Sequence, residues 1–206
     1  MAERGRPRGF DRDAALAKAM EVFWVRGYEG ASMSELTAAM GIASPSLYAA
    51  FGCKEALFRE ALALYSATES DGIWGGLETA PTARKACEGV LTATARAFTR
   101  PDKPPGCMAV LAALPGGEPD GAVREAMVRG RAGTTDRLEA RLRRGQTEGD
   151  VPAKADARAV ATYLVTVQQG MSIQARDGAT RATLEGIARA TMAGWDGLVT
   201  SVRTDD

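Results

Sequence analysis

Apolar residues recur along this chain at the spacing of amphipathic helices, and no segment alternates apolar and polar residues as a strand would. Near the N-terminus, Asp11 can cap a first helix that runs to about Arg26, and Gly27 is expected to end it. The apolar face of that helix is formed by Ala15, Leu16, Ala19, Met20 and Phe23. The pattern predicts an all-α protein of about nine helices.

Two short helices are predicted next, separated by a turn that contains one glycine. Ser32 opens the first of them and forms an S-x-x-E capping box with Glu35. Ser44 is expected to cap the second, with Pro45 in the first turn, where its missing N–H costs nothing. Gly52 ends this helix after about two turns. Two helices joined in this way form a helix-turn-helix.

The remainder of the chain continues at helical period. A fourth helix has one apolar face, formed by Leu57, Phe58, Ala61, Leu62 and Tyr65. The segment 69–76 then breaks the pattern. Further helices are predicted at about 82–99, 107–114, 122–147, 157–176 and 183–202.

The second helix of a helix-turn-helix lies in the DNA major groove, and small exposed side chains suit that close fit. Hydroxyl groups on this helix can bond to bases or phosphates, and Tyr48 can hold its hydroxyl at phosphate height. Lys54 begins the next helix, where its charge and the free amides can together hold one phosphate. The candidate DNA-binding residues are Ser32, Met33, Ser34, Ser44, Pro45, Ser46, Tyr48, Ala49 and Lys54.

Residues 10–65 resemble the N-terminal DNA-binding domain of TetR-family transcriptional regulators. The resemblance rests on F-x-x-x-G-Y-x-x-x-S-x-x-x-L, which begins at Phe23, and on G-I-x-x-x-x-L-Y-x-x-F-x-x-K-E-x-L, which begins at Gly41. It implies phosphate contacts from Tyr48 and Lys54, base-facing positions at 44, 45, 46 and 49, and nine or ten helices. It also implies a ligand pocket and a two-fold dimer interface in the C-terminal helices. The segments "PPGCMAVLAAL", "EGDVP" and "QGMSIQARDGAT" resemble those of a subset of the family.

The sequence departs from the family pattern in two places. Ala49 and Ala50 stand where many relatives carry bulky polar residues, so specificity is expected to depend on serine hydroxyls, the preceding helix and DNA shape. Cys53 stands where a serine, aspartate or asparagine cap is usual. It is interpreted either as a harmless surface variant or as an oxidant-sensitive thiol beside Lys54.

Apolar and polarizable residues of the middle helices are candidates for an effector pocket, because such pockets are mostly apolar with a few polar groups. These candidates are Tyr65, Trp74, Met108, Leu111, Met127 and Gln168. Two further stripes are candidates for the dimer interface: Leu164, Val167, Met171 and Gln174, then Ile187, Thr191 and Trp195. For both sets the alternative is that they form the core of a single chain.

Composition narrows the classes of function. The chain has 206 residues with 26 basic and 26 acidic side chains, so charge alone does not indicate a nucleic-acid partner. The local exception is the arm at residues 1–9, with Arg4, Arg6 and Arg8, which either is a tolerated terminus or tracks DNA. There is no histidine, and the three cysteines lack CxxC spacing, so no metal, cofactor or disulfide framework is predicted.

The sequence thus predicts a flexible basic arm (1–9), a helix-turn-helix domain (10–55) and a helical effector-binding and dimerisation domain (56–206). The family resemblance favours a homodimeric repressor that a small molecule releases from a palindromic operator in double-stranded DNA. We expect a cytoplasmic protein, because no long apolar run or signal peptide is present. The alternatives are a ligand-dependent activator and a helical interaction module that does not bind DNA. A thiol enzyme is disfavoured, because no histidine is available to activate a cysteine.

Overall fold

The computed structural model describes residues 10–69, 71–112 and 121–200 of the chain, and within these ranges all regular structure is helical. The all-α prediction is therefore confirmed. The arm at residues 1–9 and the end of the last predicted helix lie outside the described residues. In the same ranges, no helix combines the length and apolar character that crossing a bilayer requires.

The N-terminal helices are α1 (Arg12–Gly30), α2 (Met33–Met40), α3 (Ser44–Phe51) and α4 (Lys54–Thr68). Asp11 caps α1 as predicted, and its side chain accepts hydrogen bonds of 3.0 Å from the amides of the second and third residues after it. Gly27 has φ 73°, so it kinks α1 near its end, and the helix continues to Gly30. A residue with a side chain is disfavoured at that φ.

The cap of α3 differs from the prediction. Ala43 occupies the N-cap position and makes no side-chain capping bond, while Ser44 is already the first helical residue. The Ala43 carbonyl accepts the amides of Ser46 and Leu47, so the helix begins one residue earlier than a Ser44 cap would require. As a result, the hydroxyl of Ser44 is not used for capping and stays exposed.

The C-terminal helices are α5 (Asp71–Trp74), α6 (Ala83–Ala97), α7 (Met108–Leu111), α8 (Gly121–Glu148), α9 (Ala157–Arg176), α10 (Arg181–Ala193) and α11 (Trp195–Thr200). The short α5 forms where a break was predicted, because Ile73 and Trp74 are both buried. The last predicted helix is interrupted at Gly194 and becomes α10 and α11.

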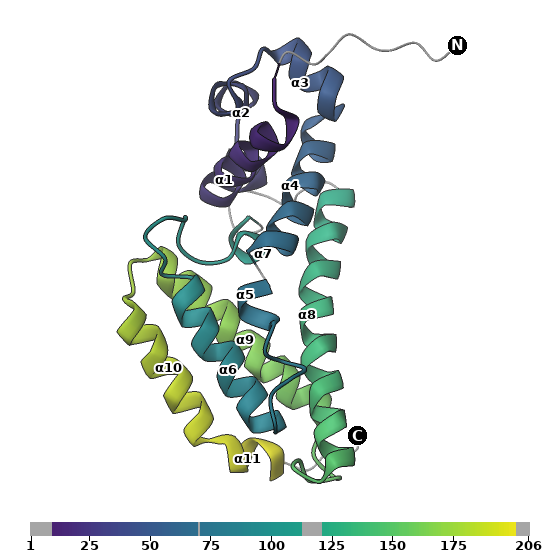
Figure 1. Ribbon diagram of the computed structural model, residues 1–206, viewed down its shortest axis with the longest axis vertical. Coiled ribbons are helices and arrows are strands. Elements are labelled where there is room, and N and C mark those ends of the chain that lie inside the picture. Colours follow the sequence, from purple (N-terminus) through teal and green to yellow (C-terminus); the bar gives the residue numbers. More distant parts are fainter. Residues whose placement is uncertain (1–9, 70, 113–120, 201–206) are drawn as a thin grey trace, which may run out of the picture.

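Two apolar cores divide the elongated molecule (Figure 1). The first joins α1 to α4 with α7 and the start of α8, and it includes Met108, Val123 and Met127. The second joins α5, α6, α9, α10 and α11 with the later part of α8. Helix α4 leaves the three-helix end and runs toward the second core, while the long α8 passes along both.

Helix α4 is fixed to α1 by aromatic and charged contacts. Phe58 meets Phe23 edge to face at 5.1 Å between ring centroids, and Tyr65 meets Trp24 in the same way at 4.8 Å. At the start of α1, Arg12 donates to both carboxylate oxygens of Glu60 at 2.8 Å and to the backbone carbonyl of Ala50 at 3.3 Å. These contacts hold α1, the end of α3 and α4 as one unit.

The turn that leads into α7 contains a tightly packed glycine. Gly106 has φ 79°, and a Cβ atom there would lie 2.6 Å from the backbone oxygen of Ser172. The amide of Cys107 donates to Ser172 Oγ at 2.8 Å, so the turn is bonded directly to α9.

We therefore expect Gly106→Ala to lower the free energy of unfolding by about 3 kcal/mol, because it combines an unfavourable φ with a clash against backbone. Urea denaturation measures the change. Gly133→Ala is the matched control, since Gly133 lies in α8 with nothing within 4 Å of its Cβ position. The control should gain about 0.5–1 kcal/mol. Equal stability of the two variants would contradict this account of the turn.

Candidate DNA interface and effector cavity

Helix α3 separates its buried and exposed residues cleanly. Leu47 and Phe51 point into the first core and are 0% and 4% exposed. On the other side Ser44, Pro45, Tyr48 and Ala49 are exposed, and Ser46 is half-buried. The outer side of α3 is therefore a narrow ridge of small side chains with one phenol, at the end of the molecule where α2 and the start of α4 also lie (Figure 1).

A single lysine stands at the start of α4. Lys54 Nζ lies 4.6 Å from the ring centroid of Tyr28, a cation–π contact that holds the ammonium close to the helix terminus. Cys53 is exposed and acts as the N-cap, with Sγ accepting the amide of Ala56 at 3.4 Å. Sulfur is a weak acceptor, so this terminus keeps much of its capacity to bind an anion.

The serines at the start of α2 are partly occupied by the capping box. Ser32 Oγ accepts the amide of Glu35 at 3.1 Å, while Glu35 Oε2 accepts the amide of Ser32 at 3.1 Å. Ser34 is exposed and its hydroxyl lies 3.0 Å from that of Ser32, and Met33 is half-buried beside them. Of the residues predicted on α2, Ser34 thus has the most freedom to contact DNA.

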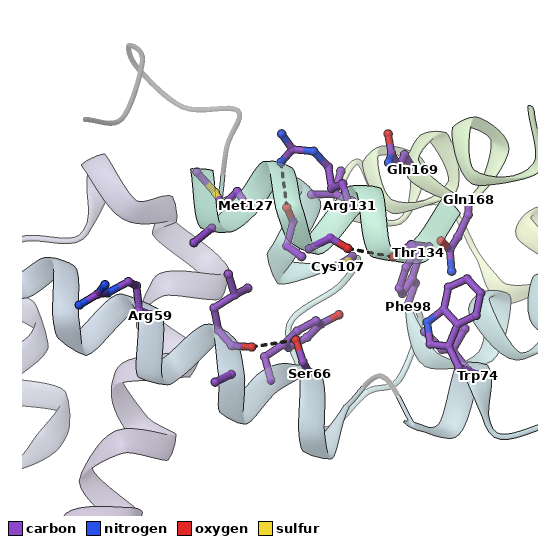
Figure 2. Close-up of a pocket in the computed structure, with 18 residues that line it drawn as sticks. Arg59, Ser66, Trp74, Phe98, Cys107, Met127, Arg131, Thr134, Gln168 and Gln169 are labelled. Atoms are coloured by element: carbon purple, nitrogen blue, oxygen red, sulfur yellow. Dashed lines mark hydrogen bonds between the residues drawn. The ribbon is translucent and has the colours of Figure 1, made fainter. Parts of the chain in front are cut away.

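A cavity of about 320 Å³ lies between the two cores, bounded by α4, α5, α7, α8, α9 and the end of α6 (Figure 2). Its larger apolar lining residues are Leu62, Tyr65, Ile73, Trp74, Phe98 and Met127. Its larger polar or sulfur-containing lining residues are Arg59, Ser66, Cys107, Arg131, Thr134 and Gln168. A mostly apolar space with a few polar groups is typical of a small-molecule site.

Four of the six residues predicted for an effector pocket line this cavity: Tyr65, Trp74, Met127 and Gln168. Met108 and Leu111 do not line it, which corrects their assignment. Met108 is fully buried in the first core, and Leu111 packs beside the Gly106 turn. The sequence reasoning missed Arg131 and Cys107, because it searched for apolar residues at helical spacing.

The titratable groups in the cavity other than the two arginines are neutral at neutral pH. Burial raises the pKa of Cys107, although hydrogen bonding to Tyr65 works in the opposite direction. Burial also raises the pKa of the Tyr65 phenol. At the opposite end, Gln168 Nε2 donates to Thr94 Oγ1 at 3.1 Å in a buried bond.

An ion-pair network ties the end of α4 to the segment after α6. Glu69 pairs with Arg100, and its Oε1 lies 3.1 Å from Lys103 Nζ. Lys103 also lies 3.8 Å from Glu21 of α1. Burial alone would raise the pKa of Glu69, but the hydrogen bonds from Arg100 and Lys103 outweigh it and hold that pKa below its usual value.

The stripes predicted for the dimer interface are largely internal. Leu164, Met171, Thr191 and Trp195 are between 1% and 7% exposed, within the chain's own cores and helix contacts. This corrects the prediction for these four residues, and the physical reason is packing within the chain: α9 packs on α6 and α8, α10 packs on α6, and α11, which begins at Trp195, packs on α9 and α10. Val167 and Ile187 are half-buried and Gln174 is exposed, at the edges of the outward faces.

The outward face of α9 instead carries Ala159, Tyr163, Thr166, Gly170 and Ile173, which are all exposed. That of α10 carries Ala182, Gly186, Ala190 and Ala193, of which Gly186 is half-buried. Tyr163 is 43% and Ile173 39% exposed, so two large apolar side chains project from the outward face of α9. Among the described residues, no group of three or more cysteine or carboxylate side chains is placed to hold a metal ion.

Comparison with known proteins gives consistent matches over both parts of the chain. Residues 15–61 match "Bacterial regulatory proteins, tetR family", and residues 85–191 match "Tetracyclin repressor-like, C-terminal domain". The HTH-type transcriptional repressors ComR and BdcR of Escherichia coli K12 are 36% and 32% identical, over 95% and 92% of this chain and 94% and 90% of theirs. A solved structure of a cysteine mutant of the TetR family transcriptional regulator CifR, complexed with 26-base-pair operator DNA, is 46% identical. It covers 93% of this chain and 100% of its own, with a TM-score of 0.89.

The Glu69 network predicts a pH-dependent stability. Because the pKa of Glu69 is lower in the folded chain than in the unfolded one, its contribution is present above the unfolded pKa and is lost as pH falls through the folded pKa. Glu69→Gln should cost about 1 kcal/mol at neutral pH, and the difference from wild type should shrink toward about pH 4. Urea titrations across that range measure it. Glu125→Gln, at an exposed pair with Arg129, is the control and should show little cost. A cost that does not depend on pH would rule out the carboxylate as its source.

Proposed function

Because this chain belongs to the TetR family of bacterial regulatory proteins, we propose that it is a homodimeric transcriptional repressor of the bacterial cytoplasm. It binds a palindromic operator through α3 and leaves the operator when a small molecule occupies the cavity. The observation that carries this proposal is the outer side of α3, where small exposed side chains lie between Tyr48 and the N-terminus of α4. The names of ComR and BdcR, as repressors, favour repression over activation.

The DNA contacts divide by chemistry. Tyr48 is 50% exposed and Lys54 is held at a helix terminus, so both suit phosphates. Ser44, Ser46 and Ala49 are short enough to let α3 approach base edges, with Pro45 and Ala49 as apolar contacts for thymine methyl groups. Ser32, Met33 and Ser34 border the same end of the molecule from α2, with Ser32 contributing mainly as the cap.

The dimer is proposed to form through the outward faces of α9 and α10. Small residues such as Gly170 and Gly186 let helix backbones approach closely, and the projecting Tyr163 and Ile173 supply apolar area. A two-fold axis presents each of these faces twice and relates two copies of α3, which is why the operator is palindromic.

The cavity is proposed to control DNA binding through α4. Tyr65 lines the cavity on one side of this helix and packs edge to face on Trp24 of α1. A ligand that prefers one position of Tyr65 and Leu62 therefore also selects a position of the DNA-binding helices. Only a difference in ligand affinity between the two positions can release the operator.

The DNA proposal is tested by selecting genomic fragments on purified protein. Wild type should enrich a palindromic site, with affinity that falls steeply as salt rises. Tyr48→Phe combined with Lys54→Ala should weaken binding to that site by about 10- to 100-fold and reduce the salt slope by about one per half-site. Lys85→Ala is the control, because Lys85 is an exposed lysine on α6 paired with Glu88, far along the chain from α3.

Enrichment of no site by wild type would instead favour a helical interaction module. If an effector strengthened operator binding instead of releasing the protein, the chain would be a ligand-dependent activator and not a repressor.

The dimer proposal is tested by placing a charge on the outward face of α10. Ala190→Glu would bury two carboxylates near the two-fold axis, so it should convert the dimer to monomer or weaken it by at least about 100-fold. Sedimentation equilibrium distinguishes twice the 21.7 kDa chain mass from the single chain. Ala132→Glu, at an exposed position on α8, should remain dimeric. A dimer that tolerates Ala190→Glu would place the interface elsewhere.

A further inference from the structure

We propose that the cavity takes a small organic acid, with its carboxylate bound by Arg131 and its apolar body lying between α4, α5 and α8. This inference rests on the proposed role of the cavity as the effector site. It goes further by naming the chemical class of the ligand and the residue that selects it.

Among the described residues, the charged side chains that line the cavity are all positive. Arg59 and Arg131 line the cavity, and among the described residues no aspartate or glutamate does. Arg59 lies at the end nearest the DNA-binding helices, apart from the other labelled side chains in Figure 2, and its Nε is 3.9 Å from Glu55. Arg131 lies between that end and the aromatic end formed by Trp74 and Phe98.

Arg131 has no charged partner within the described part of the chain. Among the described residues no aspartate or glutamate is paired with Arg131, and the hydrogen bond that it makes to them is a long one of 3.5 Å, from Nη1 to the carbonyl of Ala109. The side chain is half-buried. A guanidinium partly removed from water with so weak a partner gains strongly from a carboxylate, which it can bind through two parallel hydrogen bonds.

The end of the cavity formed by Trp74 and Phe98 disfavours a second charged group on the ligand. Trp74 and Phe98 offer ring surfaces, and Gln168 commits its Nε2 to Thr94, which leaves the amide oxygen as an acceptor. Cys107 and Tyr65 stay neutral, so they neither repel the carboxylate nor neutralise it. A volume of about 320 Å³ is at the small end for ligand sites, which suits a single ring or a medium-length chain.

The same arginine gives the acid a route to the DNA-binding helices. A bound carboxylate competes with the Ala109 carbonyl for Arg131, and Ala109 belongs to α7. Helix α7 packs against both α1 and α4. Loss of its bond to α8 therefore loosens a short helix that supports the DNA-binding unit.

The test compares acids with their neutral amides on the full-length protein. Octanoate and phenylbutyrate are titrated beside octanamide and phenylbutyramide by isothermal calorimetry, on wild type and on Arg131→Gln, Arg131→Lys and Arg129→Gln. Wild type should bind at least one acid about 10-fold or more tightly than its amide, and Arg131→Gln should abolish that preference. Arg131→Lys should keep part of it. Arg129→Gln is the matched control, because Arg129 lies on the same helix, is exposed and lies outside the lining.

The proposal fails if neither acid binds, if acid and amide bind equally, or if the preference survives Arg131→Gln. Circular dichroism melting of each variant shows that it is folded. Operator affinity is measured separately without any acid, on wild type and on Arg129→Gln, which should retain it because Arg129 lies outside the lining. A wild type without operator affinity would refute the proposed repressor function, whereas an absent acid preference with intact operator binding would refute this inference alone.

Discussion

The structure depends on one packing contact, that of α4 against α1. Phe58 and Tyr65 of α4 meet Phe23 and Trp24 of α1 edge to face, two turns apart along the same helix. Aromatic pairs of this geometry contribute about 0.5–1.5 kcal/mol beyond their buried area. Because α4 also forms one wall of the cavity, the DNA-binding unit cannot change its position without moving that wall.

The contact between α1 and α4 is rigid near α3 and has fewer bonds near the cavity. Near α3, Arg12 ties three helices together through Glu60, Ala50 and the ring of Phe51. Near the cavity, the indole N–H of Trp24 is buried and finds no hydrogen-bond partner among the residues that the structure describes. The end of α4 is held by ion pairs at Glu69 instead of by a deep apolar contact. The three-helix unit is thus expected to move as a body, with the adjustment concentrated where α4 meets the cavity.

Local features of the fold were predictable from the sequence, because their causes are local. The caps at Asp11 and Ser32 and the buried face of α4 require only neighbouring residues and helical period. The prediction placed the N-cap of α3 one residue too late, at Ser44. The actual N-cap, Ala43, makes no side-chain capping bond and therefore cannot be recognised as a cap from its residue type. The same limit applies to the residues proposed for the cavity. Tyr65 and Trp74 line it, whereas Met108 does not, because the position of Met108 depends on how the short α7 lies against α1.

The residues predicted for the dimer interface show a further limit of prediction from sequence. Apolar periodicity finds the face of a helix that leaves water, but it does not tell whether the covering surface belongs to the same chain. Leu164 and Met171 are covered by the chain itself, and the face left outside is made of residues such as Gly170 and Ala190, which carry little apolar signal.

The same reasoning explains why Arg131 was missed. One arginine on a long, highly charged helix is indistinguishable by sequence from its solvated neighbours, and only the fold reveals which of them faces an enclosed apolar space. The position of the Arg131 charge between the two cores has an energetic consequence. A ligand shifts the equilibrium only by its difference in affinity for the two states, and about 5.5 kcal/mol is needed to move a population from one to ninety-nine per cent. In the proposed mechanism, a carboxylate that pairs with the half-buried guanidinium supplies a share of that difference, because it competes with the Ala109 carbonyl for Arg131.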